Sequence, residues 1–96
     1  GSMHYIISYD IPDGKRRTKI AKLLEGHGIR VQYSVFECDL SPGLFAHLRR
    51  DLEYLLNLKE DNLRIYRLCA DCAGQVERVG VQGFFENPAS PCYLVL

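Results

Sequence analysis

The sequence has 96 residues, which fits a single domain, and 47% of them are hydrophobic and 25% charged. No apolar run approaches the length of a membrane span, and the opening run lacks the basic flank of a secretory signal. We therefore expect a cytoplasmic protein with no membrane partner. Gly1 and Ser2, before Met3, are interpreted as a cleavage scar of recombinant expression and are left out of the fold argument.

The first predicted element is a strand over residues 4–10. Its apolar run, residues 5–9 interrupted only by Ser8, is typical of a central strand buried on both faces. The strand ends on Asp10, and Pro12 prevents it from continuing because proline has no N–H for the ladder. A carboxylate at such a position is costly unless it is paired, binds a metal or lies at a wet edge.

A helix is predicted next, over about residues 14–26, with Asp13 as its cap. Its buried face combines Ile20, Leu23, Leu24 and His27, and Lys15, Lys19 and Lys22 lie on the opposite side. Gly26 or Gly28 can supply a left-handed residue at its end. The cations of the first turn, residues 15–17, oppose the helix dipole, which favours anions there.

The stretch from Asp10 to Arg17 thus breaks two local rules, as functional sites often do. An acid beside arginines suits a site for a metal and a phosphate group. The alternative is structural: Asp10 caps the bend and pairs with Arg16 or Arg17.

The charge distribution points to the same region. The net charge is zero, yet residues 1–50 carry eight Lys/Arg against five Asp/Glu, and residues 51–96 carry four against seven. We expect the nucleic-acid-binding surface to consist of Arg16, Arg17, Lys19, Lys22 and Arg30. A solvated helix face would have a similar composition.

The rest of the chain alternates strands with one helix. Residues 29–40 are extended, and a bend near Tyr33 would divide them into two short strands. A second helix begins after the N-cap Ser41 with Pro42. Its core-facing stripe is Leu44, Leu48, Leu52, Leu55 and Leu56, with Phe45 beside it. Further strands are predicted over 63–69 and 76–81, and a last apolar segment over 92–96 has no evident partner strand within the chain.

This β-α-β-β-α-β order predicts an α+β, ferredoxin-like fold for residues 3–82, an antiparallel sheet with both helices on one face and the far face open. Residues 83–96 form a C-terminal extension, whose extra strand is expected to contact a second copy of the chain across a sheet edge.

The four cysteines do not form a recognisable metal motif. Cys69 and Cys72 make a lone C-x-x-C, and Cys38 and Cys92 are not spaced as the second pair that zinc would need. The pair follows a strand, whereas a thioredoxin-like motif precedes a helix, and iron–sulfur ligation needs a denser run. We interpret all four as reduced structural cysteines.

Three features together resemble the CRISPR-associated protein two family, the small partner of the CRISPR integrase. They are Tyr-Asp-Ile at the end of the first strand, the basic start of the first helix and the run Gln-Tyr-Ser-Val-Phe at 32–36. The resemblance covers residues 3 to about 81. The C-x-x-C and the tail depart from it.

The resemblance implies a homodimeric, Mg²⁺-dependent endonuclease acting on RNA or DNA, with Asp10 as the metal ligand. Tyr9, Arg17 and Phe36 match further catalytic positions, and Arg30 matches a basic residue near the site. A single carboxylate is a poor magnesium site, so a twofold axis near Asp10 would supply a second. Members also serve as a non-catalytic core of the integrase complex, which makes a DNA-bridging scaffold the alternative. A toxin-like ribonuclease of the same fold is the third hypothesis.

Overall fold

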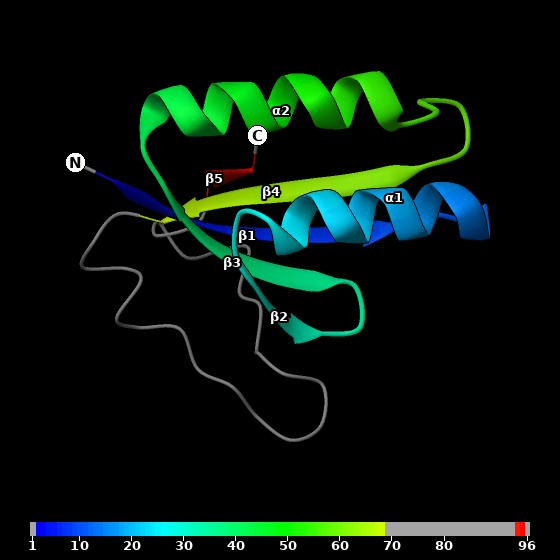
Figure 1. The fold of residues 1–96 in the computed structure, drawn as a ribbon, viewed down its shortest axis with the longest axis horizontal. Coiled ribbons are helices and arrows are strands. Elements are labelled where there is room, and N and C mark those ends of the chain that lie inside the picture. Colours follow the sequence, from blue (N-terminus) through cyan, green and yellow to red (C-terminus); the bar gives the residue numbers. More distant parts are fainter. Residues whose placement is uncertain (1, 69–93, 96) are drawn as a thin grey trace.

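A computed structural model describes residues 2–68 and 94–95. Its elements are β1 (Met3–Asp10), α1 (Gly14–Glu25), β2 (Ile29–Gln32), β3 (Val35–Leu40), α2 (Pro42–Leu55), β4 (Asn62–Leu68) and β5 (Leu94–Val95). All strand pairs are antiparallel, in the order β2-β3-β1-β4-β5 (Figure 1). The first four strands and both helices form the predicted ferredoxin-like arrangement, so the α+β fold class is confirmed.

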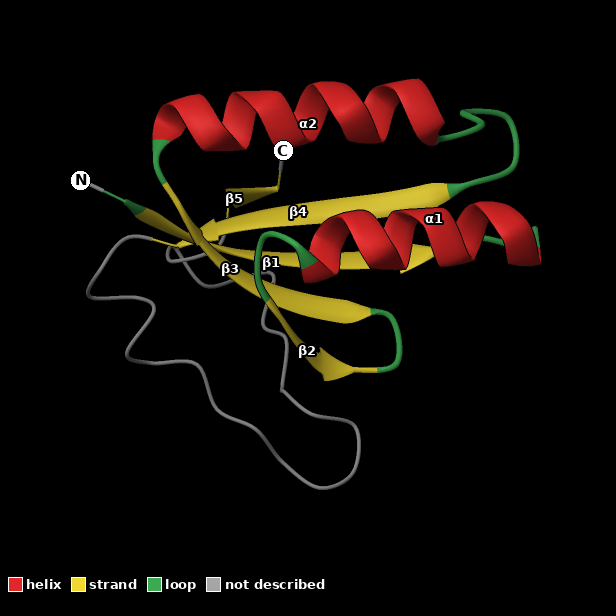
Figure 2. Cartoon of the chain, viewed as in Figure 1, coloured by secondary structure: helices red, strands yellow, loops and turns green. Residues whose placement is uncertain are grey.

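β1 is the central strand, as its apolar sequence predicts. It pairs with β3 on one side and with β4 on the other, and both helices cover the same face of the sheet (Figure 2). Side chains alternate along a strand, so one set on β1 points toward the helices. The core beneath the helices combines Tyr5, Ile7 and Tyr9 of β1 with Ile20, Ala21 and Leu24 of α1 and Leu48 and Leu52 of α2.

Both predicted N-caps are present: Asp13 accepts from the backbone N–H of Arg16, and Ser41 accepts from that of Leu44. The prediction that the leucine stripe of α2 faces the core is only partly correct. Leu44 is 53% exposed. Its neighbour Phe45 makes the sheet contact instead, stacking its ring on Tyr5 at 4.1 Å between centroids.

The far face of the sheet is only partly open, whereas the prediction left all of it open. Ile6, Tyr66 and Leu68 project away from the helix layer, and all three are buried. Ile6 and Tyr66 lie directly opposite each other across β1 and β4. These large apolar groups are therefore removed from water on the far face as well, which accounts for the nearly continuous apolar sequence of β1.

The last apolar segment does have a partner within the chain. Leu94 pairs with Arg67 and Val95 with Tyr66, so β5 extends the sheet beyond β4. Without β5, the outer edge of β4 would have unpaired backbone groups, which readily accept another strand. The sequence alone did not reveal that residues 94–95 fill this edge. The predicted strand over 76–81, the Cys69 and Cys72 pair and most of the C-terminal extension lie outside the described residues. Contact of that extension with a second copy stays a prediction.

The bend in residues 29–40 is confirmed at Tyr33–Ser34, where β2 turns into β3.

The prediction of a left-handed glycine before β2 is wrong. Gly26 closes α1 with right-handed backbone angles. Gly28 is required for space instead, because an added Cβ would collide with the carbonyl oxygen of Glu37 and the sulfur of Cys38, and would lie 3.0 Å from Cys38 Cα.

Replacing Gly28 with alanine should therefore destabilise the fold by about 1–3 kcal/mol, the usual cost of overpacking. Gly43→Ala in α2 is the matched control. Its added methyl group meets nothing within 4 Å, and alanine is the better helix former, so this change should stabilise by about 0.5–1 kcal/mol. Urea unfolding of both variants measures the difference, and equal stabilities would contradict the packing argument.

Candidate functional site

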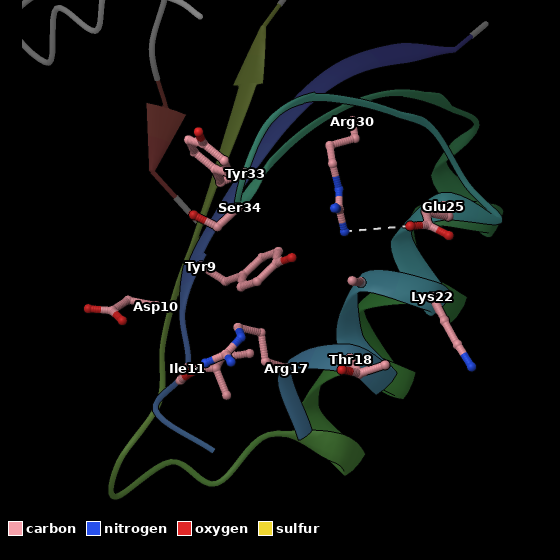
Figure 3. Close-up of a pocket in the computed structure, with 11 residues that line it drawn as sticks. Tyr9, Asp10, Ile11, Arg17, Thr18, Lys22, Glu25, Arg30, Tyr33 and Ser34 are labelled. Atoms are coloured by element: carbon pink, nitrogen blue, oxygen red, sulfur yellow. Dashed lines mark hydrogen bonds and ion pairs between the residues drawn. The ribbon is translucent and has the colours of Figure 1, made fainter. Parts of the chain in front are cut away.

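A pocket of about 560 Å³, the helix-side recess, lies between α1 and the β2–β3 turn. Residues 17, 18, 21, 22 and 25 of α1 form one wall, and Arg30, Tyr33 and Ser34 form the other. Tyr9 and Ile11, at the end of β1, complete it (Figure 3). The hairpin is tied to β1 by a hydrogen bond of 3.1 Å from the Tyr9 N–H to the Ser34 carbonyl. The recess thus brings together five predicted residues: Tyr9, Asp10, Arg17, Lys22 and Arg30.

Both arginines of the helix-side recess are held in place. Arg17 donates from Nη1 to the Ile11 carbonyl at 3.0 Å. Arg30 lies opposite Phe36 in the β2–β3 register, and its guanidinium sits 5.2 Å from the centre of that ring. Arg30 also contacts Glu25 at 3.5 Å. Each guanidinium keeps further N–H groups available, so the pair can bind an anion.

Tyr9 stands between these arginines in Figure 3 and is 5% exposed. Burial raises the pKa of its hydroxyl, and the nearby charges of Arg30 and Arg17 only partly oppose this effect. The hydroxyl therefore stays protonated at neutral pH, where it can donate a hydrogen bond but cannot act as a base.

Phe36, for which a catalytic role is predicted, lies beneath the helix-side recess and is not among its lining residues. Its side chain is fully buried, at 0% exposure, so a substrate cannot reach it. Its ring packs against Tyr9 at 6.3 Å between centroids and lies under Arg30. Phe36 therefore supports two residues of the helix-side recess without touching what binds there.

Asp10 is at the rim of the helix-side recess, but its carboxylate points away from the interior (Figure 3). It follows Tyr9 on a strand, so the alternation directs it to the opposite face. There it borders a smaller pocket of about 200 Å³, the far-side recess, with Ser8, Asn62 and Arg64. Asp10 is exposed and makes no hydrogen bond or ion pair within the described part of the chain. The structural alternative, in which it pairs with Arg16 or Arg17, is therefore wrong.

Arg16 is engaged elsewhere. Its Nε and Nη2 donate to the Asp61 carboxylate at 2.6 and 2.8 Å, and Nη2 also donates to Glu60 at 2.9 Å. The Asp61 side chain is 1% exposed and additionally accepts from the Asn57 N–H. Arg16 thus fastens α1 to the loop before β4, which argues against its predicted role in binding nucleic acid. Lys19 is exposed on α1 and does not line the recess.

Sequence reasoning missed Asp61 and the far-side residues Asn62 and Arg64. Asn62 lies opposite Asp10 in the β1–β4 register. Local spacing gives no signal for any of them, because strand pairing brings Asn62 and Arg64 beside Asp10 from a distant part of the sequence, and Asp61 meets Arg16 only in the folded chain.

No group of three or more His, Cys, Asp or Glu side chains converges on a common point among the described residues. Cys38, the one cysteine that lies within them, is buried between strands and helices. Burial, together with Asp39 and Glu37, raises the pKa of its thiol to about 11, so it is an unreactive structural cysteine as predicted.

The sequence of the chain matches a known protein family. The model of the family "CRISPR associated protein Cas2" matches residues 3–76. The chain belongs to the Cas2 family. It is 57% identical over 79 residues to the CRISPR-associated endoribonuclease Cas2 1 of Chloroflexus aurantiacus, an alignment that covers 81% of this chain and 85% of the relative. It is 52% identical to the CRISPR-associated endonuclease Cas2 2 of Thermus thermophilus, covering 84% of this chain and 86% of that one.

Solved structures agree. Streptococcus pyogenes Cas2 superposes with a TM-score of 0.73 at 36% identity, covering 81% of this chain and all of that one. A chain of a partial Cas6-RT-Cas1–Cas2 complex superposes with a TM-score of 0.70 at 29% identity, covering 88% and 99%. Neither described helix of this Cas2 protein is long and apolar enough to cross a membrane.

The Arg16 contact makes a testable statement about pH. The hydrogen bonds from Arg16 are the main reason why the pKa of Asp61 is lower than usual. The stability that this carboxylate contributes is therefore present above the ordinary aspartate pKa of about 3.9, and it is lost as the pH falls through the lower pKa of the folded protein. Asp61→Asn should therefore be less stable than wild type at pH 7, and the gap should close toward pH 2 in urea unfolding.

Glu53→Gln is the control, since the Arg49–Glu53 pair at 3.2 Å is exposed on α2 and should matter little. A gap for Asp61→Asn that stays the same from pH 7 to pH 2 would show that ionisation of Asp61 is not its cause.

Proposed function

We propose that the protein is a Mg²⁺-dependent endonuclease of CRISPR adaptation that acts as a homodimer, with the Asp10 carboxylates of both protomers at one metal site. The observation that carries this proposal is the position of Asp10, an exposed carboxylate without a partner in the described residues, fixed at the end of the central strand. The names of the relatives, endoribonuclease and endonuclease, support the same activity.

The described residues of one chain supply part of a magnesium site. Mg²⁺ prefers carboxylate oxygens and is commonly held by one or two of them together with waters and substrate phosphate. Asp10 provides one such carboxylate, and because it forms no ion pair with residues 2–68, both of its oxygens are available there. A second protomer related by a twofold axis would add the equivalent carboxylate. When bound, the metal would polarise a phosphate and activate water for phosphodiester hydrolysis.

The other residues bind and orient the substrate. Arg17 and Arg30 are held beside Tyr9 and can donate to phosphate oxygens, while the protonated Tyr9 hydroxyl can donate a further hydrogen bond. Because they lie on the helix side of β1 and Asp10 faces the other side, they serve a phosphate that flanks the scissile one. Lys22 adds positive charge to the same wall.

The second candidate is a DNA-bridging scaffold for the CRISPR integrase, with or without cleavage. The similarity to a chain of a Cas1–Cas2 assembly favours it. Membership in a CRISPR-associated family argues against a toxin-like ribonuclease unrelated to CRISPR. The substrate, RNA or DNA, and a cytoplasmic location stay part of the proposal.

Asp10→Asn separates the first two candidates. Loss of one charge from the metal site should reduce cleavage by on the order of 100-fold or more, since the metal contributes several kcal/mol to the transition state. Binding of the same oligonucleotide should be unchanged, because the arginines are intact. Cleavage of labelled RNA, single-stranded DNA and duplex DNA, with Mg²⁺ or with EDTA, measures the effect.

Asp51→Asn, an exposed carboxylate on α2, is the matched control and should cleave like wild type. Full activity of Asp10→Asn would leave the scaffold as the function.

A further inference from the structure

We propose that the helix-side recess is a binding site for a phosphomonoester, the terminal phosphate of a nucleic-acid strand, distinct from the site where Asp10 acts. The inference rests on the proposed function only for the class of ligand, nucleic acid. A pocket of about 560 Å³ is large enough to hold a terminal nucleotide with its phosphate.

The charges of the recess match a dianion. Three cations line it, and the carboxylates at its wall and rim are Glu25 and Asp10. Glu25 is paired with Arg30, and the Asp10 carboxylate points away from the interior (Figure 3). Arg17 has no acidic partner among the described residues, and neither does Lys22, whose amine points away from the interior of the recess (Figure 3). The unpaired guanidinium of Arg17, with that of Arg30 across the recess, suits a terminal phosphate, which carries close to two negative charges at neutral pH, better than an internal phosphodiester, which carries one.

The donors of the recess are preorganised for such a group. The Ile11 carbonyl fixes Arg17 at 3.0 Å, and the Phe36 ring and Glu25 fix Arg30. The Tyr9 hydroxyl lies between the two guanidinium groups (Figure 3). Little side-chain entropy is therefore lost when these groups close on a phosphate.

Tyr33 indicates that the phosphate belongs to a nucleotide and is not free inorganic phosphate. Its side chain lines the same recess, in the β2–β3 turn, and is 81% exposed. An exposed aromatic face beside cations is the arrangement on which proteins stack a nucleic-acid base. A terminal nucleotide could thus place its phosphate between the arginines and its base on Tyr33.

Binding, not cleavage, tests the inference. The protein is used as Asp10→Asn in EDTA, so that neither catalysis nor metal affects the result. Fluorescence anisotropy compares one short strand with a 5′-phosphate, a 3′-phosphate or hydroxyl groups at both ends. We expect a phosphorylated strand to bind about tenfold tighter than the hydroxyl strand, the gain from one further charge-assisted contact, and the preferred end is identified by which phosphate is effective.

The preference should disappear in Arg17→Ala. It should weaken in Arg17→Lys, because lysine keeps the positive charge but cannot form the two parallel hydrogen bonds of a guanidinium group. Lys15→Ala is the matched control, an exposed cation of the same helix outside the recess, and should keep the preference. Adenosine monophosphate should compete better than inorganic phosphate, and Tyr33→Ala should remove that difference.

Equal affinity for all three strands would overturn the proposal and leave the recess as a contact for internal phosphates. This outcome would not affect the proposed nuclease, because the activity lost in Asp10→Asn is measured separately. Conversely, a terminal-phosphate preference in a protein without nuclease activity would support the site and not the enzyme.

Discussion

The alternation of side chains along β1 is the constraint on which the site depends. β1 is paired on both sides and buried on both faces, so its register cannot slip without moving apolar groups into water. With this register fixed, Tyr9 must face the helices and Asp10 must face the opposite side. The strand end therefore presents a phenol to one face of the sheet and a carboxylate to the other.

This division separates binding from chemistry within one chain. On the helix side, the Phe36 ring supports Tyr9 and Arg30, and the Ile11 carbonyl holds Arg17, so the basic groups are arranged before any ligand arrives. On the far side, Asp10 shares a recess with Arg64 but forms no ion pair in the described part of the chain, so its carboxylate stays available to a metal. A strand of nucleic acid that passes over the end of β1 could meet both surfaces, with the carboxylate and the arginines contacting different phosphates.

Local sequence rules predicted most of the fold. The apolar run of β1, the caps Asp13 and Ser41 and the bend at Tyr33 depend on neighbouring residues, and each is confirmed. Asp10 and the arginines were recognised as a candidate site because they break such rules. The partners of these residues could not be predicted in the same way. Arg16 binds Asp61 across forty-five residues, and Phe36 reaches Tyr9 only through the pairing of β1 with β3. Such contacts are set by tertiary packing, and rules of periodicity and capping cannot predict them because these rules use only residues that are close in the sequence.

The central claim is that one metal site is shared by two Asp10 carboxylates. Dimers that combine one wild-type chain with one Asp10→Asn chain, purified with two different affinity tags, test it most directly. A shared site has lost one of its carboxylates in every mixed dimer, so nuclease activity in Mg²⁺ should be close to that of the pure Asp10→Asn dimer. Activity at half the wild-type value would show that each protomer has a site of its own, and would contradict the shared-metal account.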